Sequence, residues 1–176
     1  MAKGYIIEGR ISAKDNEALN RSAVCSADVD GGKLVSLGGL SNGLFTATVS
    51  TSGNGLYMAY NPWEHLLQIG TKLVAGESIT SDPRDYTNIA TRPLGVFKPQ
   101  VGDIIKFTDG NIKTGETGIV AGKFLEQEAG GLVVKASATA STTSFKVLDV
   151  GVLQFPQAGI GMENAKNGTV GQKYTP

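Results

Sequence analysis

Short stretches in which apolar and polar residues alternate are the main pattern in the first half of the chain. The clearest covers residues 44–50, where Phe45, Ala47 and Val49 alternate with threonines. A period of two is typical of a half-buried β-strand, because successive side chains of a strand point to opposite faces. Further strands are predicted at residues 4–11, 21–25, 33–37 and 56–60.

Polar and turn-forming segments separate these strands. Residues 26–32 contain two aspartates and two consecutive glycines, which favours a hairpin turn between the strands on either side. Residues 14–20 are polar and mildly helical, so they are predicted to be a turn or an arm. Residues 63–70 fit one helical turn or an irregular strand equally well. The longest polar stretch, residues 76–92, is predicted to be a surface connection or a boundary between two halves.

Strand signals become more regular after residue 92. Strands are predicted at residues 93–97, 101–107, 118–124, 131–135 and 144–155, with a tight turn at residues 109–111. Short strands at regular spacing are typical of a sandwich or barrel.

The sequence therefore predicts an all-β protein, a short-strand β-sandwich or barrel. It divides into an N-terminal β-hairpin region with a docking arm (1–75), a polar connection (76–92), a small β-barrel (93–158) and a Gly-rich tail (159–176) that orders only on contact with a partner.

Composition supports a turn-rich β protein. Glycine occurs 24 times in 176 residues, and charged residues make up 18 % of the chain, below the roughly 25 % of a typical globular protein. Lysine and arginine balance aspartate and glutamate at 16 each. A neutral chain has no overall field to attract nucleic acid or an anionic membrane. The sequence has no apolar run near the roughly 20 residues of a membrane helix and no secretory signal, so we expect it to stay in the cytoplasm.

Candidate catalytic and metal-ligating residues are few. The chain has one cysteine, Cys25, and one histidine, His65. Cys25 lies among small residues and is predicted to be buried and inert, and His65 beside two leucines is predicted to pack structurally. Zinc sites built from cysteine and histidine need three or four ligands, so such a site is excluded. We expect no cofactor, no metal and no catalytic residue, and hence no enzyme.

Carboxylates leave two further possibilities. Asp28 and Asp30 have the spacing that opens a calcium loop, but Gly39 stands where the closing glutamate of the loop belongs. A β-turn is the favoured interpretation there. Glu77, Asp82 and Asp85 lie on the polar connection, where a hydrolytic carboxylate pair is an alternative to solvated loop charges.

Several segments, taken in order, resemble a known family. They are the Gly-rich stretch ending in residues 33–40 (KLVSLGGL), the threonine strand 44–49 (LFTATV), residues 56–64 (LYMAYNPWE), 85–88 (DYTN), 101–107 (VGDIIKF) and 145–148 (FKVL). Together they resemble the capsid decoration proteins, also called head auxiliary or cement proteins, of tailed bacteriophages.

That resemblance implies a protein of the virion exterior, made in the cytoplasm of the host bacterium. It would bind the major capsid protein on the outside of the icosahedral head and stabilise neighbouring coat subunits. Such proteins often form homotrimers, although the sequence reveals no stoichiometry. Neither nucleic acid nor a membrane is an expected partner.

For the capsid contact we select Tyr5, Ile6 and Ile7, apolar residues in a terminus with few local partners; the alternative is that they form the first core strand.

A second function remains open. Tyr57, Tyr60 and Trp63 could line a sugar platform in a carbohydrate-binding module of a phage fibre or cell-surface protein, although Tyr57 and Tyr60 fall on opposite faces of a strand.

Overall fold

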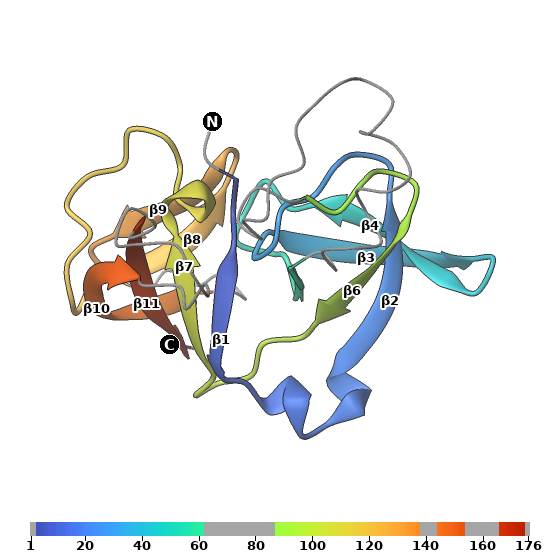
Figure 1. The fold of residues 1–176 in the computed structure, drawn as a ribbon, viewed down its shortest axis with the longest axis horizontal. Helices are drawn as coiled ribbons and strands as arrows, with labels where there is room; N and C mark the ends of the chain where they lie inside the picture. Colours follow the sequence, from blue (N-terminus) through green and yellow to red (C-terminus); the bar gives the residue numbers. More distant parts are fainter. Residues whose placement is uncertain (1–2, 62–86, 138–143, 154–165, 175–176) are drawn as a thin grey trace, which may run out of the picture.

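The computed structural model describes residues 3–61, 87–137, 144–153 and 166–174, the last of these and residues 152–153 by their backbone alone. Strands dominate this part of the chain, and its helices are single 3₁₀ turns. The predicted all-β class is therefore confirmed. Within the described ranges, no helix has the length and apolarity needed to cross a membrane. The strands form a closed five-stranded barrel and a six-stranded sheet, which lie beside each other (Figure 1).

The barrel contains β2 (Asn20–Cys25), β3 (Leu34–Ser41), β4 (Leu44–Val49), β5 (Tyr57–Ala59) and β6 (Pro93–Phe97). Its strand order is β2-β4-β3-β5-β6, and the pairing of β2 with β6 closes it. β2 and β4 are parallel, whereas the other pairs are antiparallel. The hairpin predicted around residues 26–32 is wrong, because β2 pairs with β4 and β6 and not with β3. The segment between them instead bridges to Asn88 through Val29.

A true hairpin joins β3 to β4. Asn42 and Gly43 at its tip have φ angles of 50° and 79°, which suits the two-residue turns that match the twist of paired strands. The strand predicted at residues 33–37 stops before Gly38 and Gly39, but both glycines lie inside β3. The register with β4 shifts between Leu37 and Leu40, so this glycine pair coincides with an irregularity in the ladder and not with the end of the strand.

The six-stranded sheet has the order β1-β7-β11-β10-β8-β9. Its strands are β1 (Ile6–Arg10), β7 (Ile104–Thr108), β8 (Phe124–Glu128), β9 (Gly131–Lys135), β10 (Ser144–Leu153) and β11 (Lys166–Tyr174). The Gly-rich C-terminal segment was expected to order only on a partner. Residues 166–174 instead form an inner strand that pairs with β7 on one side and β10 on the other, so backbone pairing orders them despite their weak apolar pattern.

Strand pairing does not follow the division of the chain expected at residue 93. β6 closes the barrel of the first half, and β1 pairs with β7 of the second half. The closed barrel consequently spans residues 20–97, whereas the strands expected to form a C-terminal barrel belong to the six-stranded sheet. The local pattern of a strand does not specify which distant strand pairs with it. The expected boundary at residue 93 therefore does not match the boundary between barrel and sheet.

The described residues form two apolar clusters, and alternation along the barrel strands separates them. Val35, Ala59 and Val96 belong to one cluster with Ala23, Cys25 and Ala47 of the same barrel. Their chain neighbours Leu34, Met58 and Phe97 belong to the other cluster, together with residues of the sheet such as Ile6, Phe107 and Phe145. Neighbouring residues of a strand point to opposite faces. One face of β3, β5 and β6 therefore packs inside the barrel, and the other packs against the sheet.

Polar contacts add to this junction. Asn61 holds β1 as a further strand would, because its side-chain amide donates to Ile6 O at 2.6 Å and its Oδ1 accepts from Ile6 N at 2.9 Å. The buried Asn111 donates to Gly31 O at 2.7 Å. Asp30 accepts from Gly4 N at 3.2 Å. Barrel and sheet are thus joined by apolar packing and by directed hydrogen bonds.

Candidate functional site

Of the three residues selected as a capsid contact, Ile6 and Ile7 lie in strand β1, and Tyr5 directly precedes it. Ile6 is 0 % exposed and belongs to the shared apolar cluster, and Tyr5 and Ile7 beside it are half-buried. Tyr5 N donates to Thr108 Oγ1 at 3.0 Å, and Thr108 N donates back to Tyr5 O at 3.1 Å. Ile6 therefore offers no surface to a partner in this fold, and only Tyr5 and Ile7 are partly accessible.

Asp28 and Asp30, the aspartates with calcium-loop spacing, bond the β2–β3 connection to residues 87–90. Asp28 Oδ1 accepts from Ala90 N at 2.8 Å, and Asp30 Oδ1 accepts from Thr87 Oγ1 at 2.7 Å. Nowhere in the described ranges do three or more histidine, cysteine, aspartate or glutamate side chains gather in an arrangement that could hold a metal ion. The arrangement supports the structural interpretation of this pair, in which each carboxylate caps a neighbouring segment.

A cleft of about 390 Å³ lies where the barrel meets the sheet. Asp30 and Lys33 line it from the connection between β2 and β3, and Asp109, Lys113 and Glu116 line it from the segment after β7. Its charged groups have both signs. Burial lowers the pKa of the Lys33 ammonium, and the nearby Asp30 carboxylate opposes that shift. The cleft is thus polar and of mixed charge, and Asp30 is already engaged by hydrogen bonds to Gly4 and Thr87.

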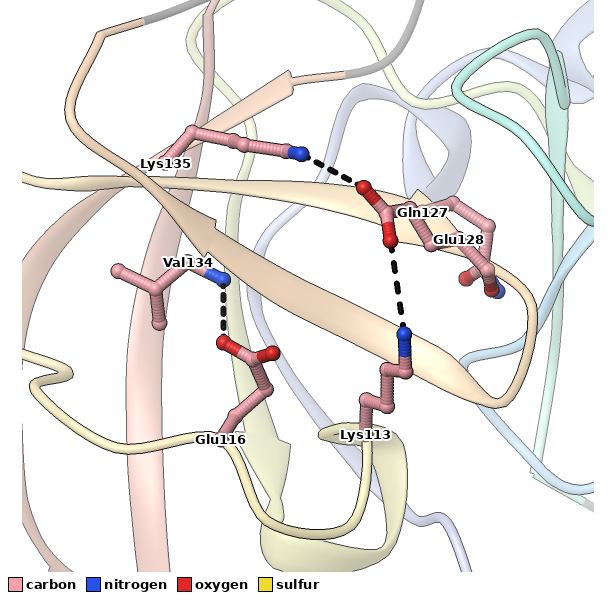
Figure 2. Close-up of polar contacts among 6 residues, drawn as sticks. All are labelled: Lys113, Glu116, Gln127, Glu128, Val134 and Lys135. Atoms are coloured by element: carbon pink, nitrogen blue, oxygen red, sulfur yellow. Dashed lines mark hydrogen bonds and ion pairs between the residues drawn. The ribbon is translucent and has the colours of Figure 1, made fainter.

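One wall of this cleft covers the outer edge of β9 (Figure 2). Lys113 N donates to Leu132 O at 2.9 Å, and Val134 N donates to Glu116 Oε2 at 3.1 Å. Glu128 lies between two lysines, 2.6 Å from Lys135 Nζ and 3.6 Å from Lys113 Nζ. The hydrogen bond from Lys135 is the main cause that lowers the pKa of Glu128, and it raises the pKa of Lys135 in turn. The backbone of Lys113 and the carboxylate of Glu116 thus cover a strand edge that would otherwise present unpaired backbone groups.

Replacing Glu116 by alanine is expected to expose the amide of Val134. The amide then has no carboxylate acceptor, and loss of one hydrogen bond of about 1 kcal/mol corresponds to an increase of about fivefold in its hydrogen-exchange rate. NMR-detected exchange measures this residue by residue. Glu128→Ala is the matched control, because the carboxylate of Glu128 contacts lysine side chains and not the Val134 amide. An unchanged Val134 rate in Glu116→Ala would contradict the assigned bond.

The two tyrosines proposed for a sugar platform are packed on different clusters. Tyr57 packs against the barrel interior, whereas Tyr60 packs against the shared cluster. The Tyr60 ring lies 4.6 Å from that of Phe97, and its hydroxyl donates to Asn20 Oδ1 at 2.7 Å. Opposite faces for these rings, as predicted, are therefore confirmed, and the two do not form one platform. Trp63 lies outside the described residues.

Tyr60 is expected to make the stability of the protein sensitive to alkaline pH. Burial, with the charges of Glu8 and Asp103, raises its pKa to about 12, from about 10 in an unfolded chain. The folded state therefore holds the phenol proton more tightly. Its contribution is complete below pH 10 and is lost as the pH rises towards 12.

The variant Tyr60→Phe should be less stable than the parent by about 1 kcal/mol at pH 8, because the bond to Asn20 is lost. This difference should shrink between pH 10 and 12. Urea unfolding across that range measures both. A difference that stays constant with pH would show that Tyr60 ionises equally in the folded and unfolded states.

One of the remaining candidate residues lies in the core, and the others lie outside the described residues. Cys25 is a free thiol in the barrel interior and is buried, as predicted. His65 and the carboxylates Glu77, Asp82 and Asp85 lie outside the described residues.

A surface that the sequence analysis missed is the tip of the β3–β4 hairpin. Residues 38–43 are exposed, and Leu40 among them is 66 % exposed. In Figure 1 this hairpin extends beyond the barrel on the side away from the six-stranded sheet. The signal was an apolar residue between glycines, in Gly-Gly-Leu-Ser-Asn-Gly. An apolar residue among turn-forming residues is expected to stay exposed.

Comparison with known proteins adds no relative: no family model matches the chain, and no curated protein or solved structure is significantly similar to it. The class that fold and site define is an all-β protein with a closed barrel packed on a sheet.

Proposed function

We propose that this chain is a capsid decoration protein that binds the outer surface of a phage head and braces neighbouring coat subunits. The order of segments that resembles this family supports the proposal, as does the neutral overall charge. The described carboxylates Asp28, Asp30 and Glu116 accept hydrogen bonds from backbone or hydroxyl groups that hold the fold together. These contacts suit a protein that acts through its surface.

The observation that carries the proposal is the projecting tip of the β3–β4 hairpin. Leu40 stands at this tip and belongs to neither apolar cluster, and the glycines around it leave its side chain uncovered. An exposed apolar side chain on a projecting hairpin can enter a pocket of a partner at little conformational cost, since the paired strands hold the tip in place. We therefore assign the capsid contact to residues 38–43 in place of Ile6.

The experiment is co-sedimentation of the purified chain with expanded heads assembled from the major capsid protein of the same phage. The parent chain should bind, and Leu40→Asp should lower binding at least about tenfold, as loss of a buried apolar anchor worth 1.4 kcal/mol or more implies. Leu56→Asp is the matched control, because Leu56 is also an exposed leucine but lies outside the hairpin. A parent chain that never co-sediments would exclude the proposed function. Equal loss in both variants would exclude the hairpin as the contact.

A further inference from the structure

The strand edges of the six-stranded sheet differ in whether other groups bond their backbone. The barrel is closed, so among the described strands the edges lie in the six-stranded sheet. The outer edge of β1 is bonded by the side chain of Asn61, and the outer edge of β9 by Lys113 N and Glu116. Both terminal strands of the sheet therefore have side chains or loop backbone on their free side, as expected for a protein that avoids pairing with other chains.

The third edge lies along the second half of β10. β8 pairs with β10 only from Ser144 to Lys146, and Val147 exchanges hydrogen bonds with Gly122 and Lys123. Beyond a register shift at Leu148, β10 pairs from Asp149 to Leu153 with β11 on one side. No strand among the described residues pairs with its other side. Leu148 and Val150 on this stretch are 40 % and 42 % exposed. An apolar strand with an open edge is a template for another strand.

One local contact guards this edge. Asp149 Oδ1 accepts from Val150 N at 2.8 Å, so the carboxylate satisfies a backbone amide that a neighbouring strand could otherwise bond. A charged residue on an edge strand weakens pairing without preventing it, because the carboxylate can turn to solvent.

We propose that this edge pairs with the same edge of a second copy of the chain, as two antiparallel strands related by a two-fold axis at Val150. In this register Asp149 of each copy faces Gly151 of the other, so the two carboxylates are not opposed. Leu148 and Val150, both exposed, then lie at the new strand pair in each copy and add apolar contact to it. The net charge of zero adds no repulsion between copies. Such an interface is self-complementary, as a two-fold dimer requires. This inference does not rest on the proposed function.

Six residues of strand make a small interface, so the dimer is expected to be weak and to depend on concentration. Analytical ultracentrifugation should show a mass near 18.3 kDa at low concentration that rises towards twice that value as the concentration increases. Val150→Lys should remain a monomer throughout the same range. Val101→Lys is the matched control, because Val101 is an exposed valine, 69 % exposed, in the connection between β6 and β7, and it should dimerise like the parent. Near-ultraviolet circular dichroism confirms that each variant is folded.

The register has its own test. In Val150→Cys the new thiols face each other across the axis, so oxidation should give a disulfide-linked dimer. Val101→Cys should give none, and the buried Cys25 stays out of reach in both. A parent chain that is monomeric at every concentration, or a dimer that Val150→Lys leaves intact, overturns the proposal. A dimer in which Val150→Cys does not cross-link overturns the pairing at Val150.

Discussion

Replacing Phe97 by alanine is expected to lower the free energy of unfolding by about 3–5 kcal/mol, the usual cost of removing a buried aromatic side chain. Phe97 is 0 % exposed and packs in the cluster that the barrel shares with the sheet. Its ring also contacts that of Tyr60. Because the side chain lies where the two parts meet, its removal leaves a cavity that neither part can close alone. Urea unfolding followed by circular dichroism measures the loss.

Phe45→Ala is the matched control for this prediction. Phe45 is also an aromatic residue on a barrel strand, but it is only partly buried against the barrel cluster. It should cost less than half as much as Phe97→Ala, since less apolar area leaves water on folding. An equal loss of unfolding free energy in the two variants would mean that the contact between barrel and sheet adds no stability beyond that of the barrel core.

Replacing Asn111 by alanine is expected to cost about 3 kcal/mol. The side chain is 1 % exposed; its amide donates to Gly31 O, and its Oδ1 accepts from both Thr108 N and Thr108 Oγ1 at 3.2 Å. Alanine makes none of these bonds. Gly31 O would stay buried without this donor, which costs about 1–3 kcal/mol, and Thr108 N would keep only its bond to Tyr5 O. Thermal unfolding together with urea unfolding measures the effect.

Asn16→Ala serves as the comparison. Asn16 Oδ1 accepts from Ala18 N at 3.0 Å, but this bond is exposed, so water replaces the lost partner and the cost should stay below about 1 kcal/mol. If Asn111→Ala were equally mild, the hydrogen bonds between η5 (Asp109–Asn111) and the barrel would not contribute to stability as proposed.

The strands were predictable where a local pattern specified them. Leu44–Val49, Gly131–Lys135 and Pro93–Phe97 are strands where alternation or turn residues indicated them. Partner choice was not predictable, because backbone pairing carries almost no residue code. The parallel pairing of β2 with β4 and the placement of β6 in the barrel both depend on contacts between distant segments. The C-terminal strand β11 was missed for a related reason. Its sequence is rich in glycine and polar residues, and its order comes from the strands on either side.

For the candidate functional residues, the sequence showed which residue types are present but not which side chains reach the surface. Burial of Cys25 followed from its small apolar neighbours. Ile6 was a poor choice for a contact, because an apolar residue near a chain end looks unpartnered until a distant strand is known to receive it. Leu40 was not selected, although its place among turn-forming residues was a signal. Val150 is an ordinary strand residue in sequence, and only the open edge distinguishes it.

The pairing of β1 with β7 also bears on how the chain reaches its fold. Tyr5 and Thr108 exchange hydrogen bonds across 103 residues of chain, and β11 must enter between β7 and β10 before the sheet is continuous. The barrel strands all lie between these segments in sequence, so the barrel can close while the sheet is still incomplete. Loops of this length are slow to close, and topologies dominated by distant contacts fold in milliseconds to seconds. In a barrel that closes first, the side chains of Leu34, Met58 and Phe97 stay exposed to water until the sheet packs against them.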